Sequence, residues 1–85
     1  MKLLVVLEDV TLNSVWRESF IDRDGREVEF FRALCTVPGE QPAQLSVMQD
    51  DFDSLTNEQG NTGTAHIEIQ ARPGSRARVI LRGLD

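Results

Sequence analysis

Apolar and polar residues alternate along most of this chain with a period of two, which is the pattern of β-strands. The first such stretch covers residues 2–21 and is interrupted at Asn13–Ser14, where turn-prone residues predict a bend or a bulge. Asp24–Gly25 comes next, and this dipeptide favours the positive φ angles of a type I′ hairpin turn. The pattern therefore predicts a long first strand that turns at Asp24–Gly25 into a second strand over Glu27–Val37.

The remainder of the chain predicts three shorter strands and one helix. Pro38–Gly39 and Pro42 end the second strand, because proline cannot donate a hydrogen bond to a neighbouring strand. After Gln49 the period changes: Phe52 and Leu55 lie three residues apart, behind aspartates that can cap a helix. The predicted elements are strands over residues 44–49, 64–72 and 76–82 and a helix over about residues 51–59.

The alternation also assigns side chains to the two faces of each strand. In the second strand Phe30 shares a face with Leu34, so we expect Phe30 to point into the core and Phe31 to point outward. The same rule places Glu68 of the fourth strand and Ile80 of the fifth strand on the exposed outer face.

The elements follow in the order strand, strand, strand, helix, strand, strand, and the first strand of about twenty residues is long enough to serve two sheets. This is the layout of the OB-fold, a five-stranded, partly open Greek-key barrel. We therefore predict an all-β fold with one short helix, forming a single OB-like domain over residues 1–85.

The size of the chain limits its core. A chain of 85 residues buries only about 60–65% of the surface that it exposes when unfolded. Because the association of two copies would add to this core, we expect a homodimer. Cys35 is the only cysteine, so it cannot form an intrachain disulfide, and we expect it to be a small buried apolar side chain. The longest apolar run, Leu3–Leu7, is far shorter than the roughly 20 residues of a membrane helix, which favours a soluble, cytoplasmic protein with no membrane partner.

Charge is distributed unevenly along the chain. The formal net charge is −5, but residues 72–85 carry four arginines against one aspartate. Eight of the nine basic residues are arginine, the side chain that pairs bidentately with phosphate and stacks on flat rings. The C-terminal arginines indicate either an anion-binding site or a solvated strand face.

Between Phe20 and Leu45 the chain combines the Asp24–Gly25 turn, the Phe30–Phe31 pair, the run Leu34–Val37 and a loop rich in proline and glycine. In this combination it resembles small OB-fold single-stranded-DNA-binding proteins. It is similar in size and layout to the dimeric helix-destabilising proteins of filamentous phages, and to the trimmed single-stranded-DNA-binding proteins of bacteria and mobile elements. The resemblance implies a non-enzymatic protein that binds single-stranded nucleic acid as a dimer.

Single-strand binding requires flat side chains on which bases stack and cations that neutralise phosphates. Aromatic and arginine side chains on the first two strands and on the fifth strand meet this requirement. The candidate nucleic-acid-binding residues are Trp16, Arg17, Phe31, Arg32, Arg76 and Arg78. For each of them a structural role stays open, because a lone tryptophan can belong to a thin core and a surface arginine can pair with a neighbouring glutamate.

The alternative function is that of a protein–protein interaction module, in which an acidic β-barrel offers exposed apolar residues such as Trp16, Phe31, Met48 and Ile80 to another subunit. Catalysis is not indicated, because the chain lacks nucleophile-elbow, phosphate-loop and dinucleotide-binding motifs. The acidic residues near position 50 lack the glycine and distal glutamate of a calcium loop, and the single histidine has no partner for zinc. We therefore expect no enzyme activity, no cofactor and no metal.

Overall fold

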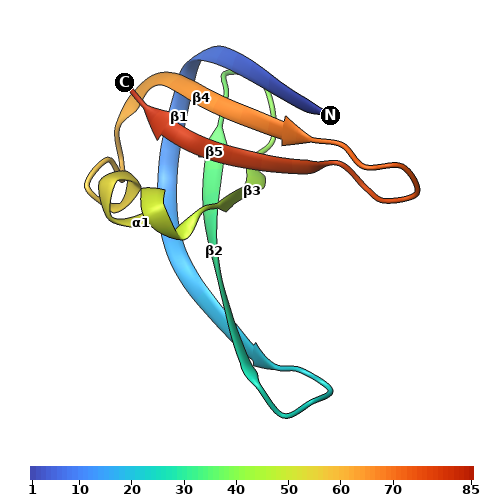
Figure 1. Cartoon of the computed structure of the whole chain (residues 1–85). Helices are drawn as coiled ribbons and strands as arrows, with labels where there is room; N and C mark the ends of the chain where they lie inside the picture. Colours follow the sequence, from blue (N-terminus) through green and yellow to red (C-terminus); the bar gives the residue numbers. More distant parts are fainter.

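The computed structural model describes all 85 residues, and its five strands and one helix follow in the predicted order (Figure 1). The strands are β1 (Lys2–Ile21), β2 (Glu27–Thr36), β3 (Ala43–Val47), β4 (Thr62–Gln70) and β5 (Arg78–Leu84), and α1 (Gln49–Thr56) lies between β3 and β4. The prediction of a mostly β protein with one short helix is confirmed. Both ends of β1 and the start of β2 agree with the prediction, and the other ends differ from it by one to three residues.

The five strands form one sheet that closes on itself in the order β1-β2-β3-β5-β4. β1 makes the closure possible because its first half pairs with β4, over residues 2–11, and its second half pairs with β2, over residues 11–21. Every neighbouring pair is antiparallel except β3 and β5, which are parallel.

Two irregularities bend β1 so that it can serve both neighbours. The register with β2 shifts between Leu12 and Ser14, which confirms the predicted bulge. The register with β4 shifts between Leu7 and Val10, where Asp9 has a φ of 59°. This second bulge was not predicted, although the apolar positions change from odd numbers at Leu3–Leu7 to even numbers at Val10 and Leu12 across Glu8–Asp9, which was a usable signal.

The β1–β2 hairpin extends beyond the closed sheet (Figure 1) and turns differently from the prediction. Gly25 has a φ of 79°, whereas Asp24 has no positive φ. Because a type I′ turn needs a positive φ at both residues, the prediction of this turn type is wrong. The Asp22 carboxylate accepts hydrogen bonds from the backbone N–H groups of Asp24 and Arg26, at 2.9 Å each. This Asx-type turn stabilises a three-residue loop that ends in the left-handed glycine.

The core lies inside the closed sheet, and α1 adds Leu55 to it. Cys35 is buried there as predicted, and burial raises the pKa of its thiol. The buried cluster consists of Val10, Leu12, Val15, Ala33, Cys35, Val47, Leu55, Ala65, Leu81 and Leu84.

Three assignments of side chains to faces are wrong. Phe31, rather than Phe30, packs against the core, because it lies on the same face of β2 as the buried Ala33. Both faces of β2 carry apolar residues, so the alternation alone could not distinguish them. Glu68 and Ile80 are opposite each other in the β4–β5 ladder and are only 3% and 0% exposed, respectively, so this part of the outer face is buried rather than open to solvent.

Candidate nucleic-acid interface

The six predicted binding residues lie in three separate places. Trp16 and Arg32 are opposite each other in the β1–β2 ladder, and Arg17 and Phe31 form the next opposite pair along it. Because neighbouring residues of a strand point to opposite faces, these two pairs lie on different faces of the hairpin. The remaining candidates, Arg76 and Arg78, lie at the β4–β5 connection.

The Trp16 and Arg32 pair is occupied by contacts within the protein. The indole Nε1 of Trp16 donates a hydrogen bond to Glu18 Oε1 at 2.7 Å, and Arg32 Nε lies 3.6 Å from Glu18 Oε2. The Arg32 guanidinium also lies 4.9 Å from the ring centroid of Phe30, a cation–π distance. Since Glu18 already balances its charge, Arg32 is not a free phosphate-binding group.

The Arg17 and Phe31 pair lies on the face that α1 covers in part. Phe31 packs against Phe52 of α1, with ring centroids 4.6 Å apart, and against the core. Arg17 lines an open hollow of about 590 Å³ whose other charged side chains are Glu29, Asp50 and Asp53. With three carboxylates around one arginine, this hollow does not suit a phosphate.

The β4–β5 connection has the opposite character. Arg72, Arg76 and Arg78 line an open hollow of about 230 Å³ together with Gln70 and Ser75, and no acidic residue lines it. None of these three arginines has a carboxylate within 4.0 Å. Sequence reasoning placed Arg72 in the C-terminal arginine group but not among the binding residues, although its position at the turn was a usable signal.

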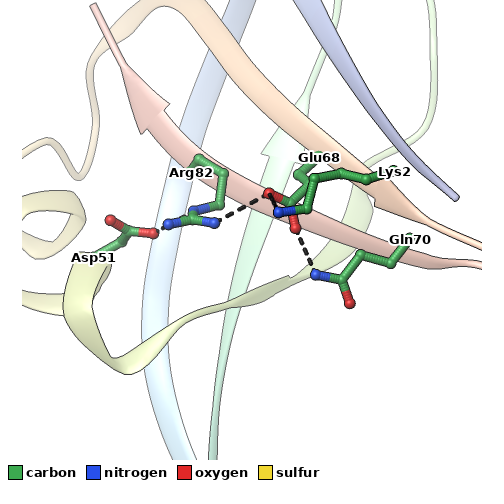
Figure 2. Close-up of polar contacts among 5 residues, drawn as sticks. All are labelled: Lys2, Asp51, Glu68, Gln70 and Arg82. Atoms are coloured by element: carbon green, nitrogen blue, oxygen red, sulfur yellow. Dashed lines mark hydrogen bonds and ion pairs between the residues drawn. The ribbon is translucent and has the colours of Figure 1, made fainter.

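Arg82, the fourth C-terminal arginine, forms ion pairs with acidic side chains of the protein (Figure 2). Its Nε lies 2.7 Å from Asp51 Oδ2 of α1, and its Nη1 lies 3.2 Å from Glu68 Oε1. Gln70 Nε2 donates to the other Glu68 oxygen at 2.5 Å, and Lys2 Nζ lies 3.6 Å from Glu68 Oε1. Arg82, Gln70 and Lys2 surround the buried Glu68 carboxylate, and Asp51 joins the cluster through Arg82. The cluster connects the start of β1 with β4, β5 and α1.

The electrostatics of this cluster follow from its contacts. The hydrogen bond from Gln70, supported by Lys2 and Arg82, lowers the pKa of Glu68 below its ordinary value, even though desolvation opposes the shift. The hydrogen bond and the charge of Asp51 raise the pKa of Arg82. Arg82 therefore stays charged and paired, and the C-terminal arginine row divides into one structural residue and three free ones.

Arg78 joins the arginine hollow to aromatic side chains. It also lines a second, smaller hollow of about 170 Å³, shared with Phe30, Phe31 and Met48 and with Glu29 as the only acid. Phe30 in turn contacts Phe20 of β1 edge to face, with ring centroids 5.7 Å apart, and Phe20 is 50% exposed. Arg78 is therefore common to the two hollows, and Phe30 links the second hollow to Phe20. We call the three free arginines together with Phe30 and Phe20 the arginine–aromatic band.

Other candidate chemistry finds no matching geometry. No group of three or more histidine, cysteine, aspartate or glutamate side chains is placed to hold a metal ion. His66 Nε2 lies 2.5 Å from Asp85 Oδ2 at the C-terminus. The one helix has eight residues, whereas a bilayer takes about 20 to cross.

Comparisons with protein-family models, with curated proteins and with solved structures find no significant match to this chain.

Proposed function

We propose that the protein is a small, non-enzymatic, OB-like protein that binds single-stranded nucleic acid along the arginine–aromatic band. One observation carries the proposal: three arginines without carboxylate partners line an acid-free hollow, and one of them, Arg78, also lines the hollow of Phe30, whose ring contacts Phe20 edge to face. Phosphates would contact Arg72, Arg76 and Arg78, and bases would stack on Phe30 and Phe20.

The strand order supports an OB-like assignment. The closed order β1-β2-β3-β5-β4 and the helix between β3 and β4 agree with a five-stranded Greek-key barrel. In such barrels oligonucleotides bind to the face of the second and third strands and to the loops between strands one and two and between strands four and five. The arginine–aromatic band lies on these elements: its rings come from the β1–β2 hairpin and its arginines from the β4–β5 connection.

The overall negative charge does not prevent such binding. At physiological salt a Debye length is about 8 Å, so the repulsion between the −5 chain and a polyanion is largely screened beyond that distance. At contact distance the bound nucleic acid would lie against the three free arginines rather than against the acidic residues of the Arg17 hollow. We therefore expect weak binding that falls steeply as the salt concentration rises.

The aromatic half of the band differs from the predicted one. Phe31 is committed to Phe52 and to the core, so Phe30 and Phe20 replace it as stacking residues. Trp16 is two residues from Glu18 and four from Phe20, on the same face of β1, so it extends the row of rings. Each base that stacks on such a ring is worth roughly 1–3 kcal/mol.

The test is the fluorescence anisotropy of a labelled oligo-dT at several salt concentrations. Arg78→Ala should weaken binding several-fold and reduce the slope of log affinity against log salt by about 0.7, the value for one phosphate on a single strand. Arg17→Ala is the matched control, because it removes the same charge from another exposed arginine and should leave the affinity nearly unchanged. The proposal is wrong if the protein fails to bind at low salt, or if both variants weaken binding equally.

A second candidate function, the protein-interaction module, is favoured by one specific observation. The N-terminal half of β1 exposes the consecutive apolar residues Leu3–Leu7. This surface is separate from the arginine–aromatic band and accepts a different kind of partner.

A further inference from the structure

The first half of β1 is an unprotected sheet edge. Residues 2–7 pair with β4 on one side, and pairing with β2 on the other side begins only at Thr11. In Figure 1 this segment, in dark blue, forms the border of the sheet beside β4. Proteins ordinarily guard such edges with charges, proline or a covering element, because a free edge is a template for another strand. Here the edge carries five consecutive leucine and valine residues.

The exposed area of this edge is large for a chain of this size. Leu4 is 77% exposed and Val6 60% on one face of the strand, and Leu3, Val5 and Leu7 are 49%, 36% and 42% exposed on the other. Together with Met1 they present on the order of 600 Å² of mostly apolar surface, divided between the two faces of the strand. A standard interface buries about 800 Å² per partner, and the part of this area beside the paired edge contributes to an interface of that kind.

The hydrogen-bonding pattern determines which residues can accept a new strand. Met1 and Ala71 exchange both of their backbone hydrogen bonds, at 2.9 and 2.8 Å. In an antiparallel ladder such pairs alternate, so Leu3, Val5 and Leu7 also direct their backbone groups toward β4. Lys2, Leu4, Val6 and Glu8 consequently direct their N–H and C=O groups toward the free edge.

The same four residues are complementary to themselves in one antiparallel register. When Val5 lies opposite the partner's Val5, Leu4 meets the partner's Val6 and Lys2 meets the partner's Glu8. Both pairings use residues whose backbone groups face the edge, so the hydrogen bonds can form. Each end of the short ladder then carries one pair of opposite charges, and apolar side chains lie opposite one another between them. The bulge at Asp9 ends the straight edge just beyond Glu8.

We propose that two copies of this chain associate by antiparallel pairing of residues 2–8 of β1, about a two-fold axis at Val5. The pairing joins two closed sheets through the apolar edge beside β4 and brings the Leu3–Leu7 side chains of the two copies next to one another. The occupant is a second copy because the hydrogen-bond direction and the order of charges both match this segment with itself. The interface does not involve the arginine–aromatic band, so the proposal is independent of nucleic-acid binding.

The first test is the mass of the protein in sedimentation velocity without nucleic acid. The wild type should have twice the 9.6 kDa mass of one chain at micromolar concentration. Leu4→Lys/Val6→Lys should be monomeric with an unchanged circular-dichroism spectrum, because both side chains are exposed in the single chain and like charges would oppose across the axis. Ser54→Lys/Asn57→Lys adds the same charge to exposed positions at α1 and should remain dimeric. A wild-type mass of 9.6 kDa overturns the proposal and would leave the edge free for a different peptide. A dimeric Leu4→Lys/Val6→Lys variant overturns it as well.

The second test concerns the register. Val5→Cys places two thiols opposite each other in a non-hydrogen-bonded pair, with Cα atoms about 4.5 Å apart, within reach of a disulfide. Leu4→Cys places them two residues out of register, at about 8 Å, beyond that reach. Under mild oxidation Val5→Cys should form a covalent dimer, while Leu4→Cys and the wild type, whose Cys35 is buried, should not. Equal cross-linking of the two variants overturns the proposed register.

Discussion

Phe30 and Phe31 are neighbours in the sequence, but the structure gives them different roles, and this difference can be measured. Phe31→Ala removes a ring that packs on Phe52 at 4.6 Å and on the core. Truncating a fully buried phenylalanine to alanine lowers the free energy of unfolding by about 3–5 kcal/mol. Phe31 is only partly buried, so about 2 kcal/mol is expected, including the part contributed by the aromatic pair.

A loss of about 2 kcal/mol lowers the Tm of an 85-residue domain by roughly 10 °C. Phe30→Ala removes a ring from the projecting hairpin instead, so it should change the Tm much less. The same variant should weaken oligo-dT binding by about 1–3 kcal/mol, since it removes a stacking surface. Thermal unfolding followed by circular dichroism and fluorescence anisotropy with oligo-dT measure the two quantities on the same samples.

The reverse pattern would assign the opposite roles to the two rings. If Phe31→Ala keeps the wild-type Tm and loses oligonucleotide affinity, then Phe31 is the stacking residue and its contact with Phe52 has little energetic weight. If Phe30→Ala retains full affinity, the aromatic half of the band must be abandoned, although the arginine hollow would still stand on its own test.

Two further predictions concern stability. Glu68→Gln should lower the urea midpoint at pH 7. Because the pKa of Glu68 is lowered in the folded state, the ionised carboxylate stabilises the fold above about pH 4.5, its ordinary pKa. This stabilisation is lost as the pH falls through the folded-state pKa. The difference between wild type and variant should therefore shrink in acid, and a constant difference from pH 7 to pH 3 would contradict the assignment. Gly63→Ala should destabilise the protein, since the added Cβ would overlap the backbone oxygen of Asp85, whereas Gly83→Ala meets nothing within 4 Å and should retain more stability; equal Tm values for the two variants would count against the close packing of the C-terminus on β4.

The amino-acid sequence by itself determined the elements and their order. The period-two pattern located all five strands, and the single change of period after Gln49 located the helix. The interruption at Asn13–Ser14 located one of the two bulges in β1. These features are local, since they depend on residues within a few positions of one another, and local patterns are what a sequence displays directly.

Tertiary structure decided which residues of a given type are free. The sequence does not distinguish the four C-terminal arginines, Arg72, Arg76, Arg78 and Arg82. Only folding brings Asp51, which is 31 positions away in the chain, into an ion pair with Arg82. The choice between Phe30 and Phe31 likewise depended on where α1 packs, because both faces of β2 are apolar.

The Leu3–Leu7 run shows the same limit most clearly. From the sequence it is a strongly apolar strand, which favours a buried position, whereas in the folded chain one of its edges and much of both faces stay open. Whether an apolar strand is covered depends on which segments the closed sheet places beside it. That is a property of long-range pairing, and no local pattern of side chains contains it.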